Sequence, residues 1–461
     1  MGKLWGTRFK KKSDALADHF SFSIAYDYRL GIYDVMASIA HAKMLGKTKI
    51  IKQTDARKII TGLKKIGKQI SAGTFKFDPK AEDVHTNIQQ ALKKIAGTAA
   101  DKLHTARSRN DLIATDMKMY CMDAVHVIVD ALTEMQKSIL KFGRKYPDVL
   151  IPAYTHLQAA QVVLLPHYML AYVEMLERDK LRLEDAFMRM DASPLGSCAL
   201  SGSSLPINRE MTAKELGFVS LTRNSIDAVS DRDFILELLS GLAILGTHCS
   251  RMAEDLIIWV TDEFDRVTLD DAFCTGSSIM PHKRNPDMLE LIRGEAAKLI
   301  SNLNELLILV KGLPLTYNRD LQLDKPPLFE SVEKSLVILE LLSKIFASMS
   351  VSEEQQAMLE FDTASNECLY SVDLVDYLIL KGASYREAHD AIGALCADVA
   401  EKNISIHELK EKDLKKYSKW LGEDIKKLLN PQHSVKAKKS FGSTSPVSVK
   451  RQLAFWKKKL K

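Results

Sequence analysis

The amino-acid sequence predicts an all-α protein of three mainly helical domains around a central bundle of long helices. Apolar residues make up 46% of the chain but aromatic residues only 7%, a balance that favours helix over sheet. Several long stretches also contain neither glycine nor proline, which suits long helices and fits strands badly. These stretches are residues 98–142, 167–193, 218–240, 247–275, 295–311 and 328–381.

The clearest helical pattern follows Asp111. Apolar side chains step by threes and fours from Ile113 to Phe142, while acidic and basic residues fall off that stripe. This spacing predicts an amphipathic helix of about eight turns. Several such helices bury their apolar stripes only against one another, which predicts a bundle. Some runs are apolar on more than one side, and we expect helices of other subunits to cover them.

Breaks in the pattern divide the chain into three predicted domains. A chain of 461 residues is longer than one hydrophobic core usually accommodates, which predicts more than one domain. Residues 1–110 carry shorter helices interrupted by glycine and proline, and form an N-terminal helical domain. Residues 111–360 form the central helix bundle. Residues 361–461 form a small C-terminal helical domain with a Gly-Ser-Pro loop, FGSTSP, at 441–446.

The charge and the cysteines of the chain argue against a nucleic-acid-binding protein and against a disulfide-bonded secreted one. The net charge of +6 arises from 65 basic and 59 acidic residues, which is a weak bias. The Lys-rich C-terminus, ending KKKLK, favours a solvated helix face over a nucleic-acid tail, because no aromatic residues are interleaved in a basic motif. The six cysteines form no CxxC pair, which is typical of reduced thiols in a cytoplasmic protein. No targeting or membrane-spanning segment is expected.

Four polar segments stand out against the helical background. They are HTARSRND at 104–111, YTHLQAAQ at 154–161, GSSIMPHKRNP at 276–286 and TYNRDLQLDK at 316–325. Each has a plain structural interpretation: a helix cap at Ser108 or Asn110, a single satisfied histidine, a rigid turn and a surface loop. Each also suits an anionic ligand, because arginines, lysines, hydroxyls and backbone amides at helix starts bind carboxylates.

No metal or cofactor site is predicted. The sequence contains no HExxH, GxxxxGK[ST], GxSxG or strand-linked GxGxxG motif. Any catalysis is therefore expected to use side chains and protons alone.

The four segments together resemble the fumarase/aspartase superfamily. GSSIMPHKRNP is similar to that superfamily's GSSxMPxKxNP signature. HTARSRND, YTHLQAAQ, SPLGSCAL and YNRDLQLDK resemble its argininosuccinate lyase branch, as do NSIDAVSDRDF at 224–234 and MAEDLIIW at 252–259. The similarity runs from LWGTRF near the start to FGSTSP and VKRQL near the end.

Some positions depart from the pattern of that branch. His282 is closer to adenylosuccinate lyases, since argininosuccinate lyases usually carry glutamine there. Ala106 stands where glycine is usual, Leu323 where an acidic residue is usual, and residues 98–102 replace a Gly-rich approach. Adenylosuccinate lyase-type activity is therefore one alternative. A non-enzymatic structural protein like the related lens crystallins is another, although the catalytic residue types are all present.

The resemblance implies cofactor-independent β-elimination of argininosuccinate to L-arginine and fumarate, the last step of arginine biosynthesis. It also implies a homotetramer, with a core of about twenty long helices and active sites shared between subunits. Such chemistry needs a base for a weakly acidic C–H, an acid for the leaving guanidine and positioned cations for a doubly charged intermediate.

The resemblance also implies a role for individual residues. Ser277 abstracts the proton, with its pKa lowered by loop amides and Lys283, and closure of the loop excludes water. His156 is paired with Glu290 as the second catalytic group. The implied substrate contacts are Ser23, Asn110, Thr155, Arg232, Asn285, Tyr317, Gln322 and Lys325, with Arg109 adding charge or support.

Overall fold

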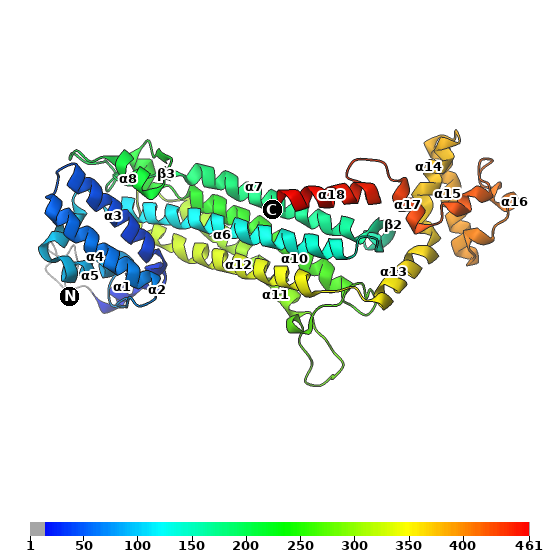
Figure 1. Ribbon diagram of the computed structural model, residues 1–461, viewed down its shortest axis with the longest axis horizontal. Helices are drawn as coiled ribbons and strands as arrows, with labels where there is room; N and C mark the ends of the chain where they lie inside the picture. The colour runs from blue at the N-terminus through cyan, green and yellow to red at the C-terminus, as the bar shows by residue number, and fades with distance from the viewer. Residues whose placement is uncertain (1–13, 461) are drawn as a thin grey trace. The chain divides into compact units, whose positions relative to one another are not determined.

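A computed structural model describes residues 14–460 of the chain, so the LWGTRF motif at residues 4–9 lies outside the described residues. The described part is mainly helical, as predicted (Figure 1). It divides into two compact units, each assembled from three stretches of sequence. Unit 1 comprises Met1–Asp130, Asp179–Gly246 and Glu295–Leu336. Unit 2 comprises Ala131–Arg178, Thr247–Gly294 and Val337–Lys461.

Unit 1 begins with helices of modest length. They are α1 (Ala15–Ser21), α2 (Ile24–Asp27), η1 (Tyr28–Leu30), α3 (Gly31–Lys47), α4 (Gln53–Ser71), α5 (Val84–Ala96) and η2 (Gly97–His104). Helices α3 and α4 lie side by side (Figure 1). Helices α4 and α5 approach closely because Gly62 has no side chain: a Cβ there would lie 2.7 Å from Leu92 Cδ1. The same unit contains α8 (Arg209–Leu216), α9 (Ser225–Ser230) and η4 (Arg319–Asp324).

Five long helices continue from one unit into the other along the chain. They are α6 (Arg109–Lys145), α7 (Leu165–Met190), α10 (Asp233–Trp259), α11 (Asp287–Val310) and α12 (Lys325–Ser348). The amphipathic helix predicted after Asp111 is confirmed as α6, and its stripe residues Ile128, Leu132 and Ile139 are fully buried. Ser108 caps it, since its hydroxyl accepts from the backbone N–H of Asn110 over 3.2 Å.

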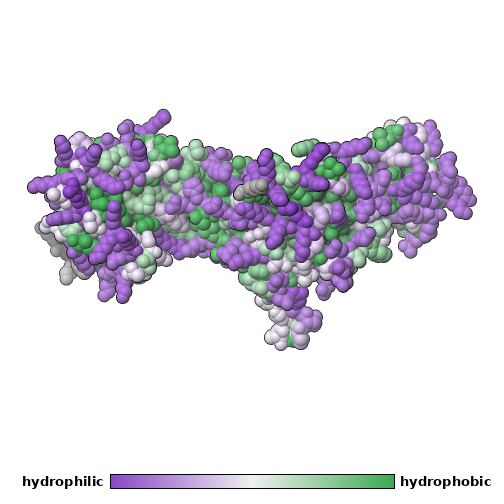
Figure 2. All heavy atoms as spheres, viewed as in Figure 1, coloured by the Kyte–Doolittle hydropathy of each residue, from purple (hydrophilic) through white to green (hydrophobic). Residues whose placement is uncertain are grey.

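Polar contacts within each unit join neighbouring long helices. In unit 2, Gln136 of α6 donates to the Val173 carbonyl of α7 over 3.0 Å. In unit 1, Asn302 of α11 donates to Ser331 of α12 over 3.0 Å, and both side chains are buried. Figure 2 shows hydrophilic side chains over most of one face, with apolar ones scattered between them.

The strictly all-α expectation is wrong in detail, because residues 14–460 include four short strands that form two small sheets. Strands β1 (Leu150–Thr155) and β2 (Gln158–Leu164) pair antiparallel in unit 2, and β3 (Ala192–Ser193) and β4 (Ser220–Leu221) pair parallel in unit 1. The β1–β2 hairpin replaces helix because its turn residues, His156 and Leu157, both adopt positive φ, near 56° and 55°. A two-residue turn of this kind matches the twist of paired strands.

The C-terminal part of unit 2 consists of short elements, as predicted. They are α13 (Glu353–Ser365), η5 (Glu367–Tyr370), α14 (Ser371–Leu380), α15 (Tyr385–Lys402), η6 (Ile406–Glu408), α16 (Glu411–Leu414), η7 (Glu423–Lys427), α17 (Pro431–Ala437) and α18 (Pro446–Lys459). A further short element of unit 2, η3 (Asp271–Phe273), lies between α10 and α11. Ser352 and Ser384 begin α13 and α15 with full capping boxes.

Helix α10 is the one described helix that is long and apolar enough to cross a membrane. Of its most apolar window, 56% is buried inside the protein. Leu238, Leu239 and Leu242 of this helix are fully buried in unit 1, as in a core helix of a bundle.

Candidate active site

Ser23 and Asp27 form a buried pair in unit 1. The Ser23 hydroxyl donates to the Asp27 carboxylate over 2.5 Å, and the backbone N–H of Val84 donates to the same carboxylate over 3.1 Å. Burial raises the pKa of Asp27 to about 7, despite the hydrogen bond from Ser23, which lowers it. Asp27 therefore fixes the orientation of the predicted substrate contact Ser23.

Gln322 and Tyr317 lie close to this pair. The Gln322 side-chain amide donates to the Ser21 carbonyl over 3.0 Å and to the Tyr26 hydroxyl over 3.2 Å. Burial raises the pKa of Tyr317, which also lies within the electrostatic influence of Arg232. Residues from both ends of unit 1's sequence thus meet here.

Two predicted cations share one buried carboxylate. Lys325 Nζ donates to Asp324 Oδ1 over 2.9 Å, and Arg232 Nε donates to the other oxygen of Asp324. All three side chains are almost completely buried. Two cations thus pair directly with a single carboxylate, and two positive groups close together suit an anionic ligand.

The HTARSRND segment leads into α6, and Arg107 and Arg109 each donate at least one side-chain hydrogen bond. Arg109 donates to the Thr86 hydroxyl over 2.8 Å, and its Nε lies 3.2 Å from Asp83. The next residue, Asn110, donates its side-chain amide to the Ala199 carbonyl over 3.1 Å. In this chain, Arg109 therefore supports the segment by pairing with acidic residues.

Asp111 ties this segment to the SPLGSCAL loop. One oxygen of its carboxylate accepts from the backbone N–H groups of Gly196 and Cys198, at 2.9 Å each, and the other from Ser108 at 3.0 Å. Burial raises the pKa of Asp111, and the hydrogen bonds from these amides oppose the shift. Two motifs distant in sequence are thereby held together.

Thr155 and His156 lie in unit 2 at the tip of the β1–β2 hairpin. Thr155 pairs with Gln158 across the turn, and both Thr155 and His156 are exposed. His156 adopts a left-handed backbone in this turn, and its side chain is exposed to solvent.

The signature loop, residues 276–286, is closed at its base by a short antiparallel bridge. Thr275 and Asn285 exchange backbone hydrogen bonds of 3.1 and 2.8 Å. Inside the loop, the Ser277 hydroxyl accepts from the backbone N–H groups of Ile279 and Met280, at 3.3 and 3.0 Å. Lys283 is exposed, and α11 begins directly after Pro286 with Glu290 in its first turn.

Unit 1 brings together Ser23, Arg232, Tyr317, Gln322 and Lys325, and it also holds Asn110. Unit 2 holds Thr155, His156, Ser277, Lys283, Asn285 and Glu290. Within the described part of the chain, no hydrogen bond or ion pair joins His156 to Glu290. Residues 14–460 also contain no cluster of three or more His, Cys, Asp or Glu side chains able to hold a metal ion.

Two family models match the chain. A model described as "Lyase" matches residues 7–301, and one described as "Argininosuccinate lyase C-terminal" matches residues 369–436. The chain is 44% identical to argininosuccinate lyase of Sulfurihydrogenibium sp. (strain YO3AOP1), covering 99% of this chain and 98% of that protein. It is 41% identical to argininosuccinate lyase of Desulforudis audaxviator, covering 100% and 99%.

The chain belongs to the argininosuccinate lyase family. The resemblance predicted from the sequence motifs is thereby confirmed, and the protein is a lyase. Solved structures share the fold. EDDS lyase in complex with formate matches with a TM-score of 0.84 and 25% identity, over 98% of this chain and 91% of that one. Class II fumarase from Schistosoma mansoni matches with a TM-score of 0.74 and 14% identity, over 90% and 93%.

Sequence reasoning missed the acidic residues that hold the side chains of the candidate site in place. Asp27 and Asp83 lie outside every polar segment singled out in the sequence, and Asp324 lies inside one without being noticed. Asp324 lay next to the predicted substrate contact Lys325, and that adjacency was the one available signal. Asp27 and Asp83 gave no such signal.

Proposed function

We propose that this protein catalyses the cofactor-independent β-elimination of argininosuccinate to L-arginine and fumarate, the last step of arginine biosynthesis. The observation that carries the proposal is the full-length identity of 44% and 41% to proteins named argininosuccinate lyase. The chemistry available in the two units supports the same reaction.

In this proposal Ser277 takes the proton from the carbon beside one carboxylate of the succinyl group. A free serine hydroxyl is a poor base, because its alkoxide is too unstable. Two backbone N–H groups directed at the Ser277 hydroxyl oxygen favour the charged form. Lys283 of the same loop adds positive charge, and closure of the loop removes competing water.

The elimination then passes through a doubly charged intermediate, which needs cations and hydrogen-bond donors at its carboxylates. Lys283 and Asn285 hold one carboxylate from unit 2. Ser23, Asn110 and Thr155 contact the succinyl portion. The buried donor network of Ser23 and Asp27 supports this role, because a preorganised hydroxyl loses little freedom on binding.

The arginine portion binds Tyr317, Gln322 and Lys325, with Arg232 adding charge. Its α-carboxylate needs a cation, and Lys325 and Arg232 together exceed the single charge of Asp324.

His156 and Glu290 form the second catalytic pair by meeting across a subunit boundary, within a homotetramer whose active sites are shared. A carboxylate beside an imidazole raises the pKa of the histidine and fixes its tautomer. Exposed apolar side chains on α11 support assembly, since Leu291 is 60% exposed and Ile308 is 58% exposed. In the assembly, the central domain 111–360 contributes its long helices to a shared core, and the domains 1–110 and 361–461 lie outside that core.

The protein works in the cytoplasm. Its six cysteines support this location, because none of them is in a disulfide bond.

Incubation of the purified protein with argininosuccinate tests the reaction. Fumarate, followed by its ultraviolet absorbance, and arginine, followed by mass spectrometry, are expected in equal amounts without added metal or cofactor. Sharing of the site is tested separately by mixing two inactive variants, Ser277→Ala and Lys325→Ala, during refolding. Regained activity supports shared sites, and no recovery contradicts them.

A further inference from the structure

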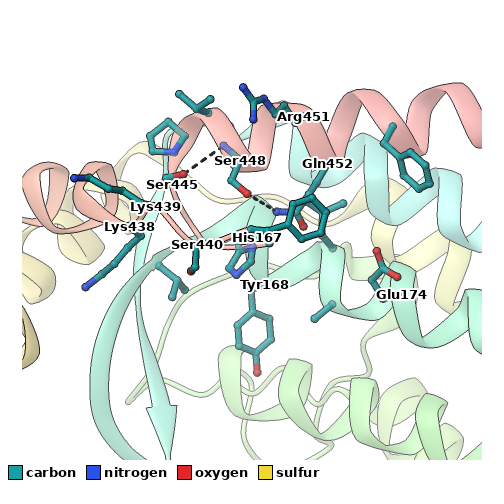
Figure 3. Close-up of a pocket in the computed structure, with 18 of the residues that line it drawn as sticks. His167, Tyr168, Glu174, Lys438, Lys439, Ser440, Ser445, Ser448, Arg451 and Gln452 are labelled. Atoms are coloured by element: carbon teal, nitrogen blue, oxygen red, sulfur yellow. Dashed lines mark hydrogen bonds between the residues drawn. The ribbon is translucent and has the colours of Figure 1, made fainter.

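Unit 2 contains a large cavity next to strand β1. It has a volume of about 1160 Å³ and opens between α7 and α18, with the loop from Lys438 to Ser445 closing one side (Figure 3). None of the residues proposed above for substrate or catalysis lines it. The proposed elimination therefore does not use the side chains that line this cavity.

Positive charge dominates the polar part of the lining. Lys436, Lys439 and Arg451 are exposed, and in the described residues none of them has an ion-pair partner. Lys438 is already paired with Asp373 over 2.6 Å. The N-terminal turn of the fourteen-residue helix α18 adds partial positive charge at the same end.

One carboxylate lines the cavity, and it is already engaged. Glu174 accepts a hydrogen bond from the Trp456 indole N–H over 3.0 Å. Figure 3 shows Lys438 and Lys439 at one end and Glu174 at the other. Charge is therefore unevenly distributed along the cavity, with Lys439 just before α18, Arg451 on α18 itself and Glu174 at the other end.

Apolar side chains form the remaining wall. Phe441, Val447 and Phe455 all line the cavity, and each is more than half exposed. His167 also lines it, and its Nδ1 atom is buried without a hydrogen-bond partner among the described residues. Burial lowers the pKa of His167, so the imidazole is neutral and offers a hydrogen bond without adding charge.

We propose that this cavity is a binding site for a small organic anion that carries its charged head on a planar apolar body. The head contacts Lys439 and Arg451 near the start of α18, and the body packs against Phe455 and Phe441. Charge-assisted contacts supply orientation, and the exposed aromatic rings supply apolar area. This proposal is independent of the elimination reaction, because the two sets of residues do not overlap.

Calorimetric titration of the intact protein with 2-naphthoate tests the site, and 2-naphthamide serves as the neutral ligand with the same ring. We expect saturable binding of one naphthoate per chain, at least about tenfold tighter than the amide. The double variant Lys439→Glu/Arg451→Glu is expected to weaken naphthoate binding by at least about tenfold.

The matched control is Lys450→Glu/Lys458→Glu, which makes the same charge change on α18 outside the cavity. It is expected to change naphthoate binding by no more than about twofold, because exposed charges at a distance are screened. A second variant, Phe455→Ala, removes part of the apolar wall without altering the charge. It is expected to weaken the binding of both naphthoate and naphthamide.

Three results overturn the proposal. Equal affinity for naphthoate and naphthamide removes the role of the cations. Equal losses of naphthoate affinity in the two double variants mean that the overall charge of the protein, and not the charge at the cavity, governs binding. Absence of naphthoate binding to the intact, folded protein means that the cavity is closed, for example by a second copy of the chain. Thermal unfolding of each variant checks that it is folded.

Discussion

Lys325 donates to Asp324 from 2.9 Å, and both side chains lie almost entirely out of contact with water. The same carboxylate accepts from Arg232 on its other oxygen. Without this anion, two cations would share a poorly solvated region and repel each other. Asp324 therefore acts as a positioning residue for two groups proposed to meet the arginine portion of the substrate.

Replacing Asp324 by Asn is expected to destabilise the protein by about 3 kcal/mol, because two buried cations lose their partner. KM for argininosuccinate is expected to rise at least about tenfold, since neither cation keeps its position. Urea unfolding and steady-state kinetics measure the two effects. Asp320→Asn, an exposed change in the same segment, is the control. Normal KM and normal stability in Asp324→Asn would show that this carboxylate does not position Arg232 and Lys325.

The raised pKa of the Asp27 carboxyl predicts how the stability of the protein depends on pH. Burial raises its pKa to about 7, against about 4 in an unfolded chain. Between these values the folded protein binds a proton that the unfolded chain releases. The contribution of Asp27 to stability is therefore fully present below about pH 4 and is lost as the pH rises through 7.

The variant Asp27→Asn cannot titrate at this position. From pH 4 to pH 8, the free energy of unfolding of the wild type is expected to fall by about 2–4 kcal/mol more than that of the variant. Urea unfolding of both proteins at several pH values measures the difference. Parallel stability profiles over that range would contradict the raised pKa.

His156→Asn separates the role of the imidazole from that of the turn. Asparagine tolerates the left-handed backbone that His156 adopts, so the hairpin is expected to remain intact. Loss of the proposed acid–base group is expected to lower kcat by about 10²–10⁴-fold. Circular dichroism checks the fold and stopped-time assays of fumarate give kcat. A kcat within a factor of about two of wild type would leave the histidine as a turn residue only.

Ser277→Ala removes the hydroxyl that accepts from Ile279 and Met280. Turnover is expected to fall by at least about 10³-fold, because the variant lacks the hydroxyl proposed to take the proton. The assembly is expected to survive, since Ser277 is only partly buried in a loop. Ser278→Ala, its exposed neighbour, is the control and is expected to retain activity. Comparable rates in the two variants would remove Ser277 from its proposed role.

Much of the fold followed from the sequence because periodicity reports burial directly. The stripe after Asp111 predicted α6, and the cap at Ser108 was among the two residues considered for it. The β1–β2 hairpin was not predicted, because its turn carries His156 and Leu157 at positive φ, where glycine or asparagine is the usual signal.

The candidate site was predictable only in part, and for a physical reason. The ordered set of motifs in the sequence identified Ser277, Lys283 and Lys325 as candidate site residues. Their supports, such as Asp27 and Asp324, act through contacts between segments distant in the chain, as in the bond from Val84 to Asp27. Local pattern carries no information about such contacts, so the polar framework became visible only in three dimensions.

The most direct test of the central claim supplies the purified wild-type protein with argininosuccinate and with adenylosuccinate in separate reactions, and follows fumarate in each. Fumarate from argininosuccinate alone is the predicted result. Fumarate from adenylosuccinate alone would contradict it, and would indicate that His282 reports the true substrate. Fumarate from neither, in a correctly folded protein, would contradict the lyase activity itself.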